Sequence, residues 1–167
     1  MAETGQNIRV AGIAGSLRDE GYTRLAVEAA LRGAQEVGAR TQLLDLGDYD
    51  LPFCDGRHDE DGYPAGVRRL REALRAVQGV ILGTPVYHGS FSGVLKNALD
   101  LMGFHEFEGK MVGLVGVSGG RTGAVYALDS LRAVGRALHA WVIPEQVSVP
   151  QAWQAFDAVG QAKDPRL

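Results

Sequence analysis

The chain has 167 residues, a length at which a single domain can bury a full hydrophobic core. Its 46% apolar and 22% charged residues are typical of a soluble globular protein and exclude a disordered chain. The net charge of −3, with basic residues spread along the chain, argues against a nucleic-acid or anionic-membrane partner. We therefore expect one domain over residues 1–167.

Short apolar runs that fit strands alternate with longer runs that carry a helical apolar stripe. Pro64 suits the first residue of a helix, and Ser92 can cap the start of another. Pro144 lies inside the last strand, which predicts that this strand is at a sheet edge. In chain order, the predicted elements are a strand at Arg9–Ala14, a helix at Thr23–Val37, a strand at Thr41–Leu46, a polar loop at Leu51–Gly62, a helix from Pro64, a strand at Gly79–Thr84, a helix from Ser92 to Met102, a strand at Met111–Val117, a helix at Ala124–Ala140 and a strand at Trp141–Val149.

This alternation predicts an α/β fold, a three-layer doubly wound domain around a five-stranded parallel sheet. Gly79–Thr84 is apolar on both faces, as expected for a strand that helices cover on both sides. In such a sheet, the loops that follow the strands meet at one edge, where ligands bind.

The loop after the first strand has the parts of a phosphate site. Gly15 lets the backbone N–H groups approach an anion, and Arg18 offers a guanidinium fork. Ser16 and Thr23 add hydroxyls beside a helix start, where the helix dipole favours negative charge. The alternative is an ordinary turn with Arg18 in water, because the loop is neither a Walker A nor a dinucleotide fingerprint.

The loop after the third strand suits a flat ring. Thr84-Pro85 forces an extended exit from the sheet, and Val86, Tyr87 and His88 then supply backbone groups and rings. A flavin ring needs an apolar or aromatic wall and backbone donors at its polar edge. Taken separately, Tyr87 fits a half-buried packing residue and His88 fits a surface histidine.

A third loop, Ser118-Gly119-Gly120, follows the fourth strand and carries almost no side-chain bulk. It could be a simple flexible turn, but it also lets a flat ligand lie against the backbone. Three such loops at one edge of the sheet predict a flavin site.

The polar loop Leu51–Gly62 holds the residues that could be mistaken for a metal site. They have no recognised ligand spacing, so we expect no metal. Cys54 is the only cysteine, so an intrachain disulfide is excluded and the cysteine content does not imply an oxidising compartment. No Gly-x-Ser-x-Gly elbow occurs, which disfavours a serine hydrolase. The loop residues concerned are Cys54, Asp55, His58, Asp59, Glu60 and Asp61.

Two segments of the chain carry a specific pattern. The first is Gly15-Ser16-Leu17-Arg18, and the second runs from Thr84 to Asp100 with the pattern Thr-Pro-x-Tyr followed by Ser-Gly-x-Leu-Lys-Asn-Ala-Leu-Asp. Together they resemble the NADPH-dependent FMN reductase family, and Ser118-Gly119-Gly120 matches the third loop of that family. The resemblance covers nearly the whole chain and implies a flavodoxin-like fold with strand order 2-1-3-4-5.

The resemblance also implies which residues bind FMN. Many relatives carry serine where Gly21 stands and asparagine where His88 stands, and asparagine is frequent at the position of Thr23. By resemblance, Ser16, Arg18 and Thr23 hold the phosphate, Pro85, Val86, Tyr87 and His88 border the isoalloxazine, and Ser118, Gly119 and Gly120 lie on its other side.

The activity implied is an FMN-dependent NAD(P)H oxidoreductase. NADPH or NADH would pass hydride to flavin N5, and the electrons would then go to a small-molecule acceptor such as free flavin, a quinone, an azo compound or a metal ion. We expect no side chain to act as general acid or base. Two alternatives are a flavodoxin-type electron carrier without its own NAD(P)H turnover and a flavin- or nucleotide-binding regulator without turnover.

Relatives in this family usually form dimers or tetramers, so a homodimer or homotetramer is expected. The helix Ser92 to Met102, with Lys96, Asn97 and Asp100 on its polar face, and the following Phe104–Phe107 could face the second subunit. The N-terminal residues do not resemble a signal peptide, and no apolar run has the length of a membrane span. A cytoplasmic location is therefore expected.

Overall fold

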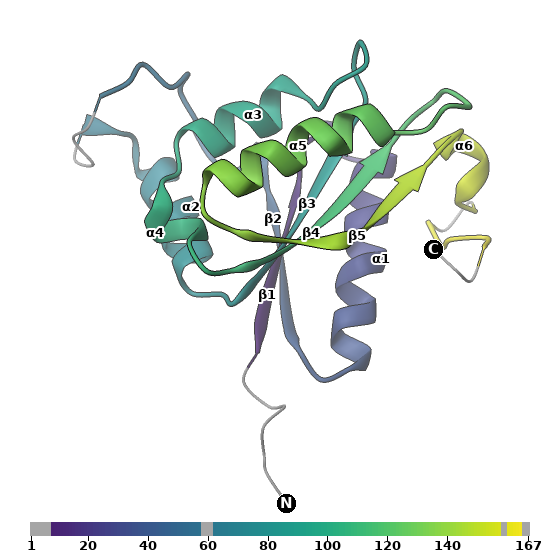
Figure 1. Ribbon diagram of the computed structural model, residues 1–167, viewed down its shortest axis with the longest axis horizontal. Helices are drawn as coiled ribbons and strands as arrows, with labels where there is room; N and C mark the ends of the chain where they lie inside the picture. Colours follow the sequence, from purple (N-terminus) through teal and green to yellow (C-terminus); the bar gives the residue numbers. More distant parts are fainter. Residues whose placement is uncertain (1–7, 58–61, 158–159, 165–167) are drawn as a thin grey trace, which may run out of the picture.

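The computed structural model describes residues 8–57, 62–157 and 160–164 and contains one five-stranded sheet (Figure 1). Its strands are β1 (Arg9–Ala14), β2 (Arg40–Asp45), β3 (Gly79–Pro85), β4 (Met111–Val117) and β5 (Trp141–Val149). All four neighbouring pairs are parallel, in the order β2-β1-β3-β4-β5. The predicted fold class and strand order are confirmed, and β5, with Pro144 inside it, is an edge strand as expected.

Helices cover both faces of the sheet. Figure 1 shows α1 on one side, whereas α3 and α5 lie on the other. On the first side, Val27 of α1 packs so close to β3 that a Cβ on Gly83 would lie 2.2 Å from its Cγ2 atom. The helices are α1 (Tyr22–Glu36), α2 (Ala65–Arg75), α3 (Gly93–Asp100), α4 (Phe104–Phe107), α5 (Val125–Ala137) and α6 (Ala152–Ala155), with a 3₁₀ turn η1 at Leu46–Asp48.

Helix boundaries differ from the predictions by a few residues. Pro64 takes the N-cap position, so α2 begins at Ala65. The helix expected to reach Ala140 ends at Ala137, because His139 adopts a left-handed backbone (φ 62°) that turns the chain into β5. An apolar stripe cannot reveal this end, because Ala140 still packs against the core after the helix has stopped.

Part of the surface expected to face a second subunit is used inside the chain. The Asn97 amide donates to the Pro52 carbonyl at 3.0 Å and accepts from the Cys54 N–H at 3.2 Å. Phe107 is fully buried, and Phe104 stacks on His139 with ring centroids 4.3 Å apart. Phe107 is therefore a core residue, whereas Phe104 is still half-exposed, and the contact of this surface with a second subunit stays a prediction.

Candidate cofactor site

Buried hydrogen bonds join the loops that follow β1 and β3. The Ser92 hydroxyl donates to the Gly15 carbonyl at 2.6 Å and accepts from the Leu95 N–H at 3.1 Å, so it caps α3 as predicted. The Ser92 N–H donates to the Thr84 hydroxyl at 2.9 Å. Thr84 and Ser92 are both buried, so the two loops are fixed relative to each other. The sequence indicated the cap but not this connection.

Gly15 is required by close approach of the backbone. Its N–H donates to the Gly83 carbonyl at 2.8 Å. A Cβ at this position would lie 2.7 Å from the Leu95 Cβ and 2.8 Å from the Gly83 oxygen. Any side chain would therefore push the first loop away from α3.

A cavity of about 240 Å³ lies where the three loops meet. Seven of the ten predicted site residues line it, and His88, Ser118 and Gly120 do not. The sequence-predicted lining residues are Ser16, Arg18, Thr23, Pro85, Val86, Tyr87 and Gly119. The residues that line it without having been predicted are Glu20, Gly21, Tyr22, Val117, Ala152 and Trp153.

One side of this cavity suits an anion. Ser16 and Thr23 are buried, and the Ser16 hydroxyl accepts a hydrogen bond from the Arg18 N–H at 3.3 Å. The guanidinium of Arg18 is exposed and has no hydrogen-bond or ion-pair partner among the residues that the structure describes. Thr23 also lies in the first turn of α1, where the helix dipole favours negative charge. Glu20 also lines the cavity, and its negative charge disfavours an anion there.

A tight turn carries Tyr87 to the other side of the cavity. The Tyr87 N–H donates to the Ser90 carbonyl at 3.0 Å, and the Ser90 N–H donates back at 3.1 Å. Between them, His88 (φ 51°) and Gly89 (φ 83°) both have left-handed backbones, as a type I′ turn requires. Asparagine favours this conformation, which explains why asparagine suits position 88. A contact between His88 and a ring stays a prediction.

We expect substitutions at position 88 to follow backbone conformation rather than side-chain chemistry. His88→Val should lower the free energy of unfolding by about 1–2 kcal/mol, because a β-branched residue is strained at positive φ. His88→Asn should stay within about 0.5 kcal/mol of the wild type. Urea unfolding of the three proteins measures this, and equal stability of the valine and asparagine variants would contradict it.

The third loop is held by its own serine. The Ser118 hydroxyl accepts from the Gly120 N–H at 3.0 Å, and the Ser118 N–H donates to the Val149 carbonyl at 2.9 Å. The side chain is therefore engaged within the loop, and Gly119 presents bare backbone to the cavity.

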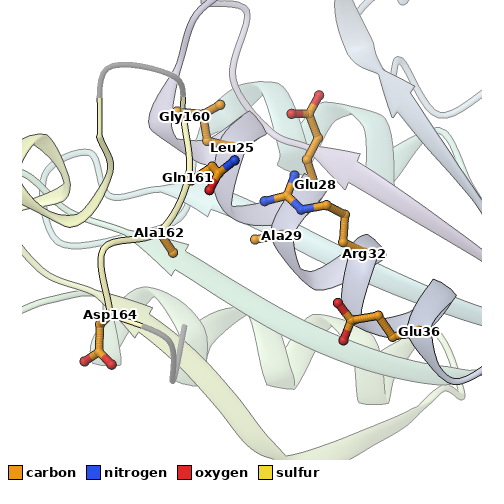
Figure 2. Close-up of a pocket in the computed structure, with 10 residues that line it drawn as sticks. Leu25, Glu28, Ala29, Arg32, Glu36, Gly160, Gln161, Ala162 and Asp164 are labelled. Carbon is orange, nitrogen blue, oxygen red and sulfur yellow. The ribbon is translucent and has the colours of Figure 1, made fainter.

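A larger hollow of about 600 Å³ lies elsewhere, between α1 and residues 160–164 (Figure 2). Figure 2 shows Glu28, Arg32 and Glu36 along one side of it and Asp164 on the other. The Glu28 carboxylate already accepts from Arg24 at 3.0 Å. This hollow has mixed charges and no aromatic wall, so it suits a flavin less well than the cavity between the three loops.

In the polar loop whose residues could be mistaken for metal ligands, Asp55 and Arg57 form an ion pair. Arg57 donates to the Asp55 carboxylate at 2.9 Å, and this hydrogen bond lowers the pKa of Asp55 to about 2. Within residues 8–57, 62–157 and 160–164, no three His, Cys, Asp or Glu side chains gather as metal ligands would. His58, Asp59, Glu60 and Asp61 lie outside the described residues.

None of the helices described here has the length and apolar character needed to span a bilayer.

Three relatives with curated names align with this chain. An NAD(P)H-dependent FMN reductase of Pseudomonas aeruginosa is 36% identical over 96% of this chain and 87% of its own length. The NADPH-dependent FMN reductase ArsH of Shigella flexneri is 33% identical over 98% of this chain. An FMN-dependent NADPH-azoreductase of Staphylococcus aureus is 42% identical over 64% of this chain. The chain spans only 64% of the length of ArsH and 58% of that of the azoreductase.

Solved structures have the same fold. FerB of Paracoccus denitrificans, a flavoenzyme NAD(P)H:(acceptor) oxidoreductase, superposes with a TM-score of 0.74 at 26% identity, over 95% of this chain and 88% of its own. An NADH:FMN oxidoreductase, EMOB, has a TM-score of 0.75 at 23% identity over 92% of this chain and 82% of its own, a likeness of fold alone. The family model described as NADPH-dependent FMN reductase matches residues 8–154, and it includes all three loops. The chain therefore belongs to the NADPH-dependent FMN reductase family.

Proposed function

We propose that this protein binds FMN between its three loops and uses it to oxidise NADPH or NADH and to reduce a small-molecule acceptor. The observation that carries the proposal is one cavity where anion-binding groups meet an aromatic wall. Ser16, Arg18 and Thr23 line one part of it, and Tyr87 and Gly119 line another. A phosphate joined to a flat ring matches this division.

The residues present fit the cofactor. The exposed Arg18 guanidinium and the N–H groups at the start of α1 suit the dianionic phosphate, and the hydroxyls of Ser16 and Thr23 can donate to its oxygens. Pro85 and Val86 offer an apolar surface to the ring, beside Tyr87. Ser92 and Gly15 keep these two groups of residues at a fixed separation.

When bound, FMN supplies two-electron chemistry between a reduced nicotinamide and the acceptor. The tasks of the chain are to orient the cofactor, to leave one face open to the two substrates and to shield the other face from water. Tyr87, which is 44% exposed, lies where it can contact both the cofactor and an incoming ring. Relatives named FMN reductase and azoreductase support free flavin and azo compounds as acceptors, with quinones and metal ions as further candidates.

A flavodoxin-type electron carrier is the alternative function for the same cavity. The named relatives are reductases that use NADPH or NAD(P)H, which favours turnover over passive electron transfer.

We also propose that a second copy of the chain covers the open side of the site. The cavity of about 240 Å³ is smaller than the roughly 300–1,000 Å³ of pockets that enclose a drug-sized ligand. Single-domain organisation and a cytoplasmic location stay predictions. Light scattering on the purified protein tests assembly, and a monomer at micromolar concentration would count against it.

The decisive experiment is a visible spectrum of the purified protein, loaded with FMN, before and after anaerobic addition of NADPH. Flavin absorbance that co-elutes with the protein and bleaches with NADPH is the expected result. Bound flavin that stays oxidised with both NADPH and NADH would favour the regulator. Rapid NADPH oxidation without a partner protein would exclude the carrier as the main role.

A further inference from the structure

The helix that follows β5 reaches the candidate FMN site, although no predicted loop includes it. In Figure 1, α6 lies just beyond the end of β5, at the carboxyl edge of the sheet. Two of its residues, Ala152 and Trp153, line the same cavity as Arg18 and Tyr87. Ala152 is buried, whereas Trp153 is 58% exposed.

Backbone hydrogen bonds fix α6 to the third loop. The Gln151 N–H donates to the Gly120 carbonyl at 3.1 Å, and the Ala152 N–H donates to the Ser118 carbonyl at 3.0 Å. Gln151 has a left-handed backbone, with φ 43° and ψ 51°, which residues with a Cβ rarely adopt. Such a conformation persists when the surrounding contacts determine it, as these two bonds do.

A second anchor joins the end of α6 to the start of α1. The buried ring of Phe156 stacks on Tyr22, with centroids 6.0 Å apart and planes 15° from parallel. Tyr22 is the first residue of α1 and itself lines the cavity. Trp153 is therefore carried on a short segment attached both to the third loop and to the proposed phosphate-binding helix.

Two exposed aromatic residues of the cavity, Tyr87 and Trp153, follow the two strands that flank β4. Tyr87 follows β3 and Trp153 follows β5, and β4 lies between these strands in the sheet. Val117, the last residue of β4, also lines the cavity. The cavity thus has an apolar strand end between two aromatic residues.

We propose that Trp153 is a cofactor-contacting residue whose indole packs against the uncharged part of the bound flavin nucleotide. This inference rests on the proposed function. It accounts for a large apolar side chain that stays more than half exposed at a cavity mouth while its neighbours on both sides are anchored. An indole next to a flavin loses exposed apolar area and gains a stacking surface.

The test compares FMN affinities of FMN-free proteins by isothermal titration calorimetry. Trp153→Ala should weaken binding about tenfold, and Trp153→Phe should stay within about threefold of the wild type because a ring is retained. Trp141→Ala is the matched control and should not change affinity. Trp141, the only other tryptophan, is 69% exposed. It is the first residue of β5, so it lies at the amino end of that strand, away from the cavity at the carboxyl ends.

The fluorescence lifetime of bound FMN gives a readout that does not depend on turnover. An indole packed against the flavin quenches its fluorescence. The fluorescence lifetime of bound FMN should therefore lengthen in Trp153→Ala and stay unchanged in Trp141→Ala. Circular dichroism and thermal unfolding of each variant establish that it folds.

The outcomes separate this inference from the proposed function. Wild-type affinity and lifetime in Trp153→Ala would overturn the role of Trp153 and leave FMN binding intact. A wild-type protein that does not bind FMN would overturn both.

Discussion

Ser92→Ala is expected to lower the free energy of unfolding by about 2–4 kcal/mol. Two effects add. The helix α3 loses its N-cap, which costs about 0.5–2 kcal/mol. The buried Gly15 carbonyl loses its donor, which costs a further 1–3 kcal/mol or so. Urea unfolding of the FMN-free protein measures the change.

Ser130→Ala is the matched control for this prediction. The Ser130 hydroxyl donates to the Tyr126 carbonyl at 2.9 Å on the exposed face of α5, so its loss should stay within about 0.5 kcal/mol. Ser92→Ala should also weaken FMN binding, because the first loop is then no longer tied to α3. A change in unfolding free energy under 1 kcal/mol would show that the hydroxyl does not hold the two loops together.

The fold could be predicted from local patterns because most strands here are buried and uninterrupted. Gly79–Thr84 is apolar on both faces, and such a run fits only a central strand covered by helices on both sides. Pro144 marked the edge strand for an equally local reason, the missing backbone donor. Helix ends were less certain, since His139 stops α5 through its backbone conformation rather than through a typical stop residue.

The site was predictable as far as it is built from residues near strand ends. Ser16, Arg18, Tyr87 and Gly119 follow β1, β3 and β4, and parallel pairing brings those ends to one edge. What the sequence could not show were side-chain hydrogen bonds across 77 residues, such as the one from Ser92 to Gly15. Trp153 was missed although it follows β5, because no motif accompanies it.

Arg18→Ala is expected to weaken FMN binding about 10- to 100-fold. A charged hydrogen bond to phosphate contributes about 1.5–3 kcal/mol, and each 1.4 kcal/mol corresponds to about tenfold in affinity. The guanidinium has no other partner among the described residues, so its removal leaves no buried group unpaired in the FMN-free protein. The effect should therefore appear in binding and not in stability.

The measurement is a pair of titrations, with FMN and with riboflavin, on three proteins. Arg18→Ala should lose FMN affinity and keep that for riboflavin, which lacks the phosphate. Arg40→Ala makes the same change in net charge at the start of β2, at the far edge of the sheet, and should leave both affinities unchanged. Raising the salt concentration should reduce the difference in FMN affinity between wild type and Arg18→Ala, because salt screens the attraction between an exposed cation and the phosphate. If Arg18→Ala bound FMN as tightly as Arg40→Ala and the wild type, Arg18 would not contribute to phosphate binding. The phosphate would then be held by Ser16, Thr23 and the start of α1.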